Sequence, residues 1–386
     1  MRIVYAALDQ RVPGTTGGSV HVTAVAGGLA ALGHEVDVLT TQGPGPFPDG
    51  LARWHALAPP LGLRHLRVLR AGAVRALADK VRADVIIERY HNFGGEGLRA
   101  AKAIGAVAVL EVNAPVIDYP GSPKARLDKA LLVEPMRRWR DRQCRMADLL
   151  VTPAAEVLPA FVPREKIVEI EWGADTERFV PGAAGAVPFA KRPGALLAVF
   201  AGAFRAWHGA ITLVRAIREL RASGRRDVDA VLIGDGPELA RARAEADGID
   251  GITFTGAVAH ARMPACLAAA DIGVAPFDVA AHPPLQLAFY WSPLKVFEYM
   301  AAGLPVAAPA IPRLARILGP GHERLLYDAQ APRGLADALV YAADHDDERR
   351  RLGAAARQRV CDQFSWAAHC RALDSAIRHL MRRRSR

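Results

Sequence analysis

The chain has 386 residues, of which 51% are apolar and 6% aromatic, and this length predicts two α/β domains rather than a single core. Its net charge of +10 favours anionic partners, but no known nucleic-acid-binding motif accompanies the basic clusters, which argues against nucleic acid. Apolar stretches such as 195–204 are too short to span a bilayer, and four cysteines without CxxC or metal-ligand spacing indicate thiols in a reducing cytoplasm.

The first half of the chain predicts alternating strands and helices. RIVYAAL (2–8) indicates a strand that starts without signal-peptide architecture, and a glycine-bearing loop, DQRVPGTTGGS (9–19), follows it. A helix over 20–33 would end at Gly33, and further strands are expected at 34–41, 83–90 and 106–115. This order predicts a parallel sheet with helices on both faces.

The strand–helix order restarts after residues 171–195, which are dense in Gly, Pro and Ala and predict an interdomain linker. Strands are expected at 196–202, 229–233, 251–258 and 271–277, with helices over 211–222 and 263–270 between them. Two doubly wound halves in series are therefore expected, with ligands beyond the carboxyl ends of the strands and a cleft between the halves.

Two glycine-bearing turns follow strands where ligands commonly bind. PGTTGGS (13–19) places Gly17 and Gly18 before a helix, and GDGPE (234–238) places Gly234 directly after a strand. Neither turn has the GxGxxG dinucleotide fingerprint, which disfavours a Rossmann oxidoreductase. A tight strand-to-helix turn explains each pattern equally well, so both interpretations stay open.

Charged residues stand at two further strand or helix ends. AGAFRAWHGA (201–210) carries Arg205 and His208 after a strand, where a guanidinium suits bidentate phosphate binding. SPLK (292–295) predicts a helix start at which Lys295 adds charge to an anion site. Glu298, about one turn further, suits hydrogen bonds to ribose hydroxyls, so Lys295 and Glu298 are predicted to face one nucleotide diphosphate.

The segment SPLKVFEYMAAGLPV (292–306) resembles the signature helix of GT-B glycosyltransferases of family 4. VLIGDGPEL, ITFTGAV, ADIGVAPF and FSW occur in the same order as in that family, and residues 17–41 are similar too. The resemblance covers nearly the whole chain. It implies two Rossmann-like doubly wound domains facing a central cleft, namely an N-terminal acceptor-side domain (1–180) and a C-terminal nucleotide-sugar-binding domain (190–365). A last helix (366–386) would cross back to the N-terminal domain.

The resemblance also implies roles for individual donor-side residues. Glu298 matches the family glutamate that binds the donor ribose, and Arg205 and Lys295 fall where cations neutralise the diphosphate. Gly17 and Gly18 match the loop near the phosphates and the acceptor.

Two strand ends of the first half supply the remaining candidates. In ERYHNFGG (88–95) the family often has a histidine near the donor sugar, so His91 is the catalytic candidate and Arg89 the alternative. In LEVNAP (110–115), Glu111 and Asn113 are candidate acceptor-side contacts.

The chain departs from the family pattern at two positions. Tyr290 stands where the family often has an acid that touches the donor sugar, which leaves the identity of that sugar open. His208 precedes Gly209 where a lysine is common. A histidine is only partly charged at neutral pH, so Arg205 and Lys295 would carry more of the phosphate neutralisation.

These features predict a bacterial, cytoplasmic, retaining glycosyltransferase of hexosyltransferase type that needs no cofactor and no metal site. A UDP-sugar is the first expectation for the donor and a GDP-sugar the next, with ADP and dTDP open. A small molecule and a lipid-linked acceptor both stay open, as do the glycosylated atom and the oligomeric state. A nucleotide-sugar epimerase of the same fold and a non-catalytic GT-B-like partner protein are the alternatives. Tyr290 in place of an acid disfavours the first, and the presence of Glu298, Arg205 and Lys295 disfavours the second.

The positive charge gathers in residues 124–145 and in the tail RHLMRRRSR (378–386). A solvated helix face is the simpler interpretation of these clusters. A face that docks at the inner side of an anionic membrane is the alternative, and it would suit a lipid-linked acceptor.

Overall fold

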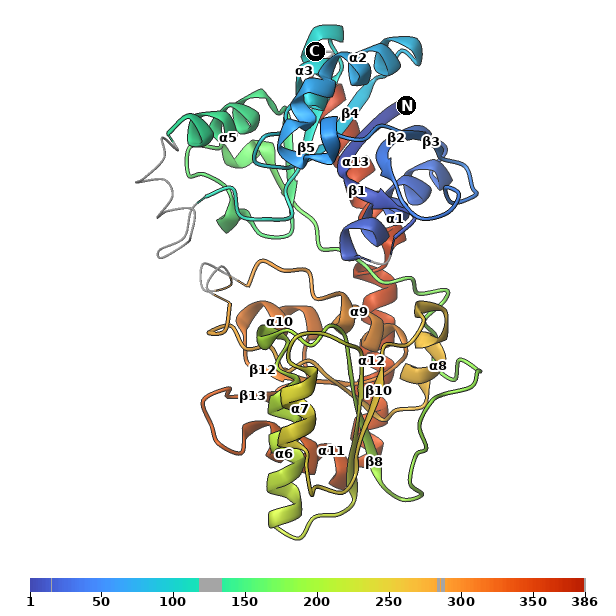
Figure 1. The fold of residues 1–386 in the computed structure, drawn as a ribbon, viewed down its shortest axis with the longest axis vertical. Helices are drawn as coiled ribbons and strands as arrows, with labels where there is room; N and C mark the ends of the chain where they lie inside the picture. Colours follow the sequence, from blue (N-terminus) through green and yellow to red (C-terminus); the bar gives the residue numbers. More distant parts are fainter. Residues whose placement is uncertain (15, 118–133, 283–284, 286–288, 385–386) are drawn as a thin grey trace. The chain divides into compact units, whose positions relative to one another are not determined.

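The computed structural model describes residues 1–386 except 15, 118–133, 283–284, 286–288 and 385–386, and it divides into two compact units (Figure 1). Unit 1 comprises Met1–Trp172, Tyr290–Ser292 and Trp366–Arg386, and unit 2 comprises Gly173–Phe289 and Pro293–Ser365. The chain thus leaves unit 1 at Trp172, returns for three residues, and returns again for its last helix.

Unit 1 contains a seven-stranded sheet in the order β3-β2-β1-β4-β5-β6-β7, and its paired strands are parallel. A doubly wound sheet of this order has a topological switch point between β1 and β4, where ligands commonly bind. The strands are β1 (Arg2–Val12), β2 (Glu35–Gln42), β3 (Arg53–Ala56), β4 (Val85–Arg89), β5 (Val107–Glu111), β6 (Leu149–Thr152) and β7 (Ile167–Glu169).

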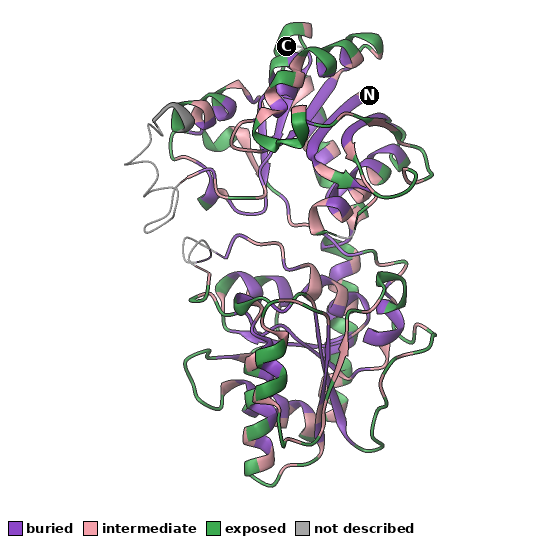
Figure 2. Cartoon of the chain, in the orientation of Figure 1, coloured by how far each residue is buried: buried purple, intermediate pink, exposed green. Residues whose placement is uncertain are grey.

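The last helix of the chain is part of the core of unit 1. Cys370, Leu373 and Ile377 on α13 are buried in one cluster with Val22 and Val25 on α1, together with side chains of the central strands. Figure 2 colours the chain by burial and shows the central strands of this sheet as buried. The helices of unit 1 are α1 (Gly17–Ala31), α2 (Ala71–Lys80), α3 (Glu96–Ile104), α5 (Glu134–Met146) and α13 (Trp366–Arg384), with 3₁₀ turns η1 (Pro60–Gly62), η2 (Arg64–Arg70), η3 (Ala155–Val157) and η4 (Arg164–Lys166).

Unit 2 contains a six-stranded sheet in the order β10-β9-β8-β11-β12-β13, again with parallel pairing and a switch point between β8 and β11. Its strands are β8 (Leu196–Ala201), β9 (Val228–Ile233), β10 (Ile252–Gly256), β11 (Ile272–Val274), β12 (Val306–Pro309) and β13 (Leu326–Tyr327). Its helices are α6 (Ala210–Ala222), α7 (Leu239–Glu245), α8 (Met263–Ala268), α9 (Leu294–Ala301), α10 (Pro312–Leu318), α11 (Gly334–Asp344) and α12 (Asp346–Gln363), with η5 (Ala206–His208) and η6 (His260–Arg262). The predicted pair of doubly wound α/β domains is therefore confirmed.

The predicted loop 9–19 is mostly regular structure, which corrects that expectation. Strand β1 runs on to Val12 because β2 extends to Gln42 and offers Arg11 and Val12 further partners beyond a shift of register. Helix α1 then begins at Gly17, with Thr16 as its N-cap.

The Gly- and Pro-rich stretch 171–195 contains the passage from unit 1 to unit 2, between Trp172 and Gly173. Its first part packs on unit 2: Ala174 pairs with Ser365, Phe179 is buried, and the Arg357 guanidinium donates to the carbonyl oxygens of Thr176 and Phe179. Most of residues 181–194 are exposed.

Most of the basic segment 124–145 lies outside the described residues, which resume at Glu134 with α5. In the part of the chain that the structure describes, no helix combines the length and apolarity needed to cross a membrane. The docking of residues 124–145 on a membrane stays a prediction.

Candidate functional site

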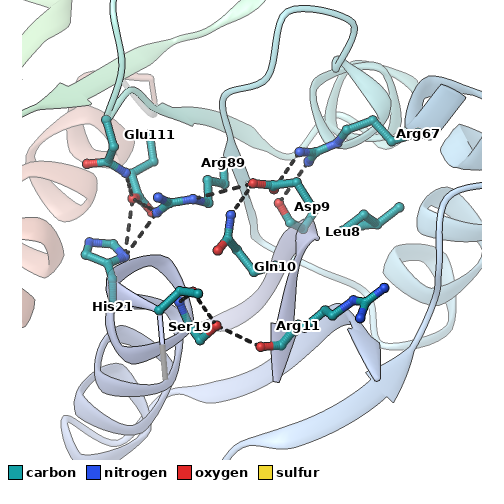
Figure 3. Close-up of polar contacts among 12 residues, drawn as sticks. Leu8, Asp9, Gln10, Arg11, Ser19, His21, Arg67, Arg89 and Glu111 are labelled. Carbon is teal, nitrogen blue, oxygen red and sulfur yellow. Dashed lines mark hydrogen bonds and ion pairs between the residues drawn. The ribbon is translucent and has the colours of Figure 1, made fainter. Parts of the chain in front are cut away.

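The switch point of unit 1 brings together charged side chains from the carboxyl ends of three strands (Figure 3). Asp9 follows the buried part of β1, Arg89 ends β4 and Glu111 ends β5, and all three are nearly buried. Buried charges are tolerated only when they are paired, so each of these three side chains needs a partner of opposite charge at this edge of the sheet.

Asp9 is held by a fully buried arginine from a distant segment. Arg67 Nη1 lies 2.7 Å from Asp9 Oδ1, and Arg67 Nε lies 2.5 Å from Glu96 Oε1 at the start of α3. Burial opposes ionisation of Asp9, but Arg67 and Arg89 outweigh it and hold the pKa of the carboxyl below its ordinary value. Asp9 is therefore a carboxylate at neutral pH.

Arg89 lies between two carboxylates. Its Nη1 is 3.0 Å from Glu111 Oε1 and its Nε is 3.8 Å from Asp9 Oδ2, while its guanidinium lies 5.8 Å from the centre of the Trp172 ring. Glu111 also accepts hydrogen bonds from the Tyr5 hydroxyl and the Asn113 amide. The predicted residues Arg89, Glu111 and Asn113 thus meet in one network, whose members largely satisfy one another.

His21 on α1 completes this network. Its Nδ1 lies 3.3 Å from Glu111 Oε1, and burial, with Arg89 and His369 adding to it, lowers the pKa of the imidazole well below its ordinary value. A neutral ring that donates from Nδ1 suits a carboxylate acceptor. Asn113 is fixed from its other side, because Trp172 Nε1 donates to Asn113 Oδ1 at 2.8 Å.

The loop that carries His91 is fastened at both ends. Glu88 accepts from the backbone N–H groups of Gly95 and Leu98, so a side chain of β4 caps α3 from outside that helix. Gln143 Nε2 donates to the His91 carbonyl oxygen at 3.1 Å. Burial and the nearby Glu96 raise the pKa of Glu88 to about 8. His91 is therefore held two residues beyond Arg89 at the same sheet edge.

Gly17 and Gly18 lie in the first turn of α1 and not in a loop, which corrects their expected setting. A β-carbon on Gly18 would collide with the Gln10 side chain, so close packing at the end of β1 is one reason for glycine there. Their place at a helix start still exposes backbone donors, which suits an anion.

In unit 2, glycines let the loops after three strands approach one another closely. A β-carbon on Gly234, after β9, would collide with the Gly202 carbonyl oxygen after β8, and one on Gly209 would collide with the Pro276 carbonyl oxygen after β11. Gly234 also has a φ of 137°, which disfavours other residues. Gly234 is thus required by the packing of this edge, whether or not it also touches a donor.

Lys295 and His208 meet at this edge beside Gly202. The Lys295 ammonium lies 4.2 Å from the centre of the Phe200 ring and 5.3 Å from that of Phe277, and a β-carbon on Gly202 would lie 3.0 Å from Lys295 Nζ and 3.7 Å from His208 Nδ1. Lys295 Nζ is buried and makes no hydrogen bond to any residue within the described ranges.

The pKa values of this pair are displaced downward. Burial lowers the pKa of Lys295 to about 7, with Glu298 opposing the shift, and burial together with the Lys295 charge lowers the pKa of His208 to about 3. His208 Nδ1 donates to the Ala203 carbonyl oxygen at 2.5 Å, so its Nε2 is the acceptor of a neutral ring. A buried cation without a counter-ion is suited to bind an anion.

The other predicted donor-side residues are divided between the units. Arg205, the residue before η5, is exposed, and Glu298 lies one turn after Lys295 on α9 with 23% of its side chain exposed and His260 Nε2 at 3.6 Å. Tyr290 is buried and belongs to unit 1, where the neighbouring Ser292 hydroxyl accepts from the Trp172 backbone N–H at 3.1 Å. Arg205, His208, Gly234, Lys295 and Glu298 therefore belong to the carboxyl edge of unit 2, and Tyr290 is counted with unit 1.

Sequence analysis missed Asp9, Arg67, Glu96 and His21. Asp9 directly follows an apolar strand, the same signal that singled out Arg205, and could have been found in that way. Arg67 stands 58 residues from Asp9 and 29 from Glu96, and nothing in the local pattern connects them. Across the described ranges, no three His, Cys, Asp or Glu side chains come together as a group that could hold a metal ion.

Comparison with known proteins identifies the family to which the chain is similar. The model described as "Glycosyltransferase Family 4" matches residues 15–178, and the model described as "Glycosyl transferases group 1" matches residues 195–345. The first match covers the sheet of unit 1 except β1 (Arg2–Val12), which precedes residue 15, and the second covers the sheet of unit 2.

Individual relatives are similar over part of their length. The chain is 29% identical over 227 residues to the D-inositol 3-phosphate glycosyltransferase of Corynebacterium glutamicum strain R, covering 55% of this chain and 51% of the relative. It is 30% identical over 226 residues to the GDP-mannose-dependent α-(1-6)-phosphatidylinositol monomannoside mannosyltransferase of Mycobacterium tuberculosis H37Rv, covering 54% of each. The matched region thus spans about half the length of these relatives.

The fold is that of solved proteins of the GT-B type. Sucrose-phosphate synthase from Thermosynechococcus elongatus superimposes with a TM-score of 0.72 at 21% identity, over 98% of this chain and 99% of that one. The two family models between them match most of the chain. The chain belongs to the group 1, family 4 glycosyltransferases of GT-B fold.

Proposed function

We propose that the protein transfers a hexose-type sugar from a nucleotide-diphosphate sugar to a nucleophilic acceptor, with retention of the anomeric configuration and without a metal ion. The observation that carries this proposal is the buried Lys295 ammonium beside Gly202 at the switch point of unit 2, which makes no hydrogen bond to any residue that the structure describes. A diphosphate would supply hydrogen-bond acceptors and negative charge to this cation, and the exposed Arg205 would add a second positive charge.

In the proposed reaction, the bond between the anomeric carbon and the diphosphate breaks while the acceptor oxygen, or another nucleophile, attacks from the same face. The nucleoside diphosphate leaves with the electron pair, and the acceptor proton passes to it. Lys295, Arg205 and the first turn of α1 would stabilise the developing negative charge. Glu298 would hold the ribose, and His91 or Arg89 would contact the donor sugar.

The donor nucleotide is proposed to be UDP first and GDP next. A relative named as GDP-mannose-dependent supports GDP as the second candidate. The printed names of the relatives also support a phosphorylated or lipid-linked acceptor, because they include inositol 3-phosphate and a phosphatidylinositol mannoside.

Calorimetric titration of UDP, GDP, ADP and dTDP, with Mg²⁺ and with EDTA, tests the proposal. We expect one nucleotide to bind equally well in both conditions and to raise the melting temperature. Glu298→Ala should weaken its binding roughly 10–100-fold, since hydrogen bonds to a charged group are lost. Glu245→Ala is the matched control: its side chain is equally exposed, at 23%, but it lies at the far end of α7 and pairs with Arg215.

The outcomes separate the alternatives. Binding of none of the nucleotides would favour a non-catalytic protein, and binding that requires Mg²⁺ would contradict metal independence. Conversion of the sugar of a bound donor without any acceptor would favour the epimerase.

A further inference from the structure

The Glu298 carboxylate, to which the proposed function assigns the donor ribose, lies beside a histidine from a different segment. His260 Nε2, in η6, is 3.6 Å from Glu298 Oε1, and the two side chains are 43% and 23% exposed. A partly exposed glutamate has several rotamers of similar energy, and a ligand that fixes one of them loses conformational entropy. A neighbour that selects the right rotamer in advance would therefore favour binding.

His260 is itself held by an arginine. Arg178 Nη1 lies 2.9 Å from His260 Nδ1, and Arg178 Nη2 donates to the His260 carbonyl oxygen at 2.6 Å. A guanidinium has only donors, so His260 Nδ1 must be the acceptor of this contact. The ring proton is then on Nε2, which is the nitrogen that faces Glu298. Arg178 thus fixes both the position and the tautomer of the histidine.

The turn that carries Arg178 is anchored at several points. The Arg178 backbone N–H donates to Asp175 Oδ1 at 3.1 Å, and the next residue, Phe179, is buried. The Arg357 guanidinium donates to the carbonyl oxygens of Thr176 and Phe179, at 2.8 and 2.7 Å. All of these residues belong to unit 2, so the support of the carboxylate lies within one compact unit.

We propose that His260 is a positioning residue of the donor site. Its Nε2 proton, directed by Arg178, holds the Glu298 carboxylate in the rotamer that accepts hydrogen bonds from the ribose hydroxyls. The present separation of 3.6 Å is longer than a hydrogen bond, and we expect it to shorten when the ribose orders the carboxylate. This role rests on the proposed function, because it needs Glu298 to bind a ribose.

Calorimetric titration with two forms of one nucleotide tests this role. The probes are whichever of UDP, GDP, ADP and dTDP binds, and its 2′,3′-dideoxy form. The wild type should bind the form with hydroxyls about 10–100-fold more tightly, since hydrogen bonds to a carboxylate are lost in the other. His260→Leu should reduce this ratio about 3–10-fold and leave the affinity for the dideoxy form unchanged. A purely structural role would weaken binding of both forms alike.

Three further variants locate the effect. His260→Gln should restore most of the ratio, because its amide nitrogen can donate from about the place of Nε2. In the Glu298→Ala background, His260→Leu should have no further effect, since the histidine acts through that carboxylate. His55→Leu is the matched control and should keep the ratio of the wild type: His55 is 37% exposed and its Nε2 pairs with Asp37, but it lies on β3 of unit 1.

The outcomes separate this role from the proposed function. A ratio that His260→Leu leaves unchanged, or equal weakening of both forms, would overturn the positioning role while nucleotide binding stands. An effect of His260→Leu that persists in the Glu298→Ala background would overturn it too, because the histidine would then contact the donor directly. A wild type that binds none of the four nucleotides would overturn the proposed function, and this role with it.

Discussion

Lys295 shows how a single residue can be costly for the fold and suited to a ligand. Its ammonium is buried against Phe200 and Phe277, and burial lowers its pKa to about 7. Cation–π contacts replace only part of the lost hydration. An apo protein would gain stability if the charge were removed, so its presence is better explained by an anionic ligand.

Lys295→Met is expected to raise the melting temperature at pH 6 by at least about 2 °C. In the wild type the folded chain releases the lysine proton near pH 7, whereas the unfolded chain keeps it up to its ordinary range near 10.5. The unfolded chain thus binds more protons between these values, and wild-type stability rises with pH across that window. The advantage of the variant should be complete below pH 7 and disappear towards pH 10.5, as measured by thermal unfolding from pH 6 to 10.

The control for this prediction is Lys80→Met, because Lys80 is exposed at the end of α2. It should leave the pH dependence of unfolding as in the wild type. An advantage of Lys295→Met that is independent of pH would show that apolar packing, and not removal of a charge, stabilises the variant.

At the scale of elements, the contact of α13 with α1 depends on one glycine. A β-carbon on Gly28 would collide with Cys370 Sγ, whereas a β-carbon on the adjacent Gly27 would meet nothing within 4 Å. Both glycines lie inside α1, so their helix propensities are equal and only the contact differs.

Gly28→Ala is expected to lower the free energy of unfolding by about 1–3 kcal/mol, because the buried Cys370 and α13 must shift. Gly27→Ala should instead raise it by about 0.5–1 kcal/mol. Urea denaturation of both variants measures the difference. Similar values for the two alanines would mean that α13 does not pack on α1 as described.

At the scale of the whole molecule, each unit has a core of its own. One buried cluster is built on the sheet of unit 1 and includes α13, and the other is built on the sheet of unit 2 with α6 and α11. The two units are not consecutive halves of the sequence, because α12 belongs to unit 2 and the following helix α13 belongs to unit 1.

Ending the chain after Ser365 should therefore destabilise the unit that contains the N-terminus. Loss of Cys370, Leu373 and Ile377 would open the core of unit 1, while unit 2 would keep all of its buried residues. Hydrogen exchange should show lost protection in β1 and α1 and unchanged protection in β8 and β9. Ending the chain after Leu380 is the control and should change little, since Arg382, Arg383 and Arg384 are exposed. Uniform loss of protection in both units would contradict two separate cores.

The sequence by itself determined the class of fold, the strands that lead to the site and the start of α9 next to Lys295, which is the second residue of that helix. These features depend on local periodicity, on glycine and proline, and on the charge at helix ends. All of these are properties of residues that lie close together in the sequence. The roles predicted for His91, Arg205, Glu298 and Tyr290 stay predictions, since they concern a ligand.

Only the tertiary structure decided which distant residues meet. The pairing of Arg67 with Asp9 and Glu96, the placement of Tyr290 in unit 1 and the contacts of Arg357 with Thr176 and Phe179 join segments far apart in the chain. Such contacts have no local signal, because the free energy that selects them comes from burial and ion pairing after the sheets have formed.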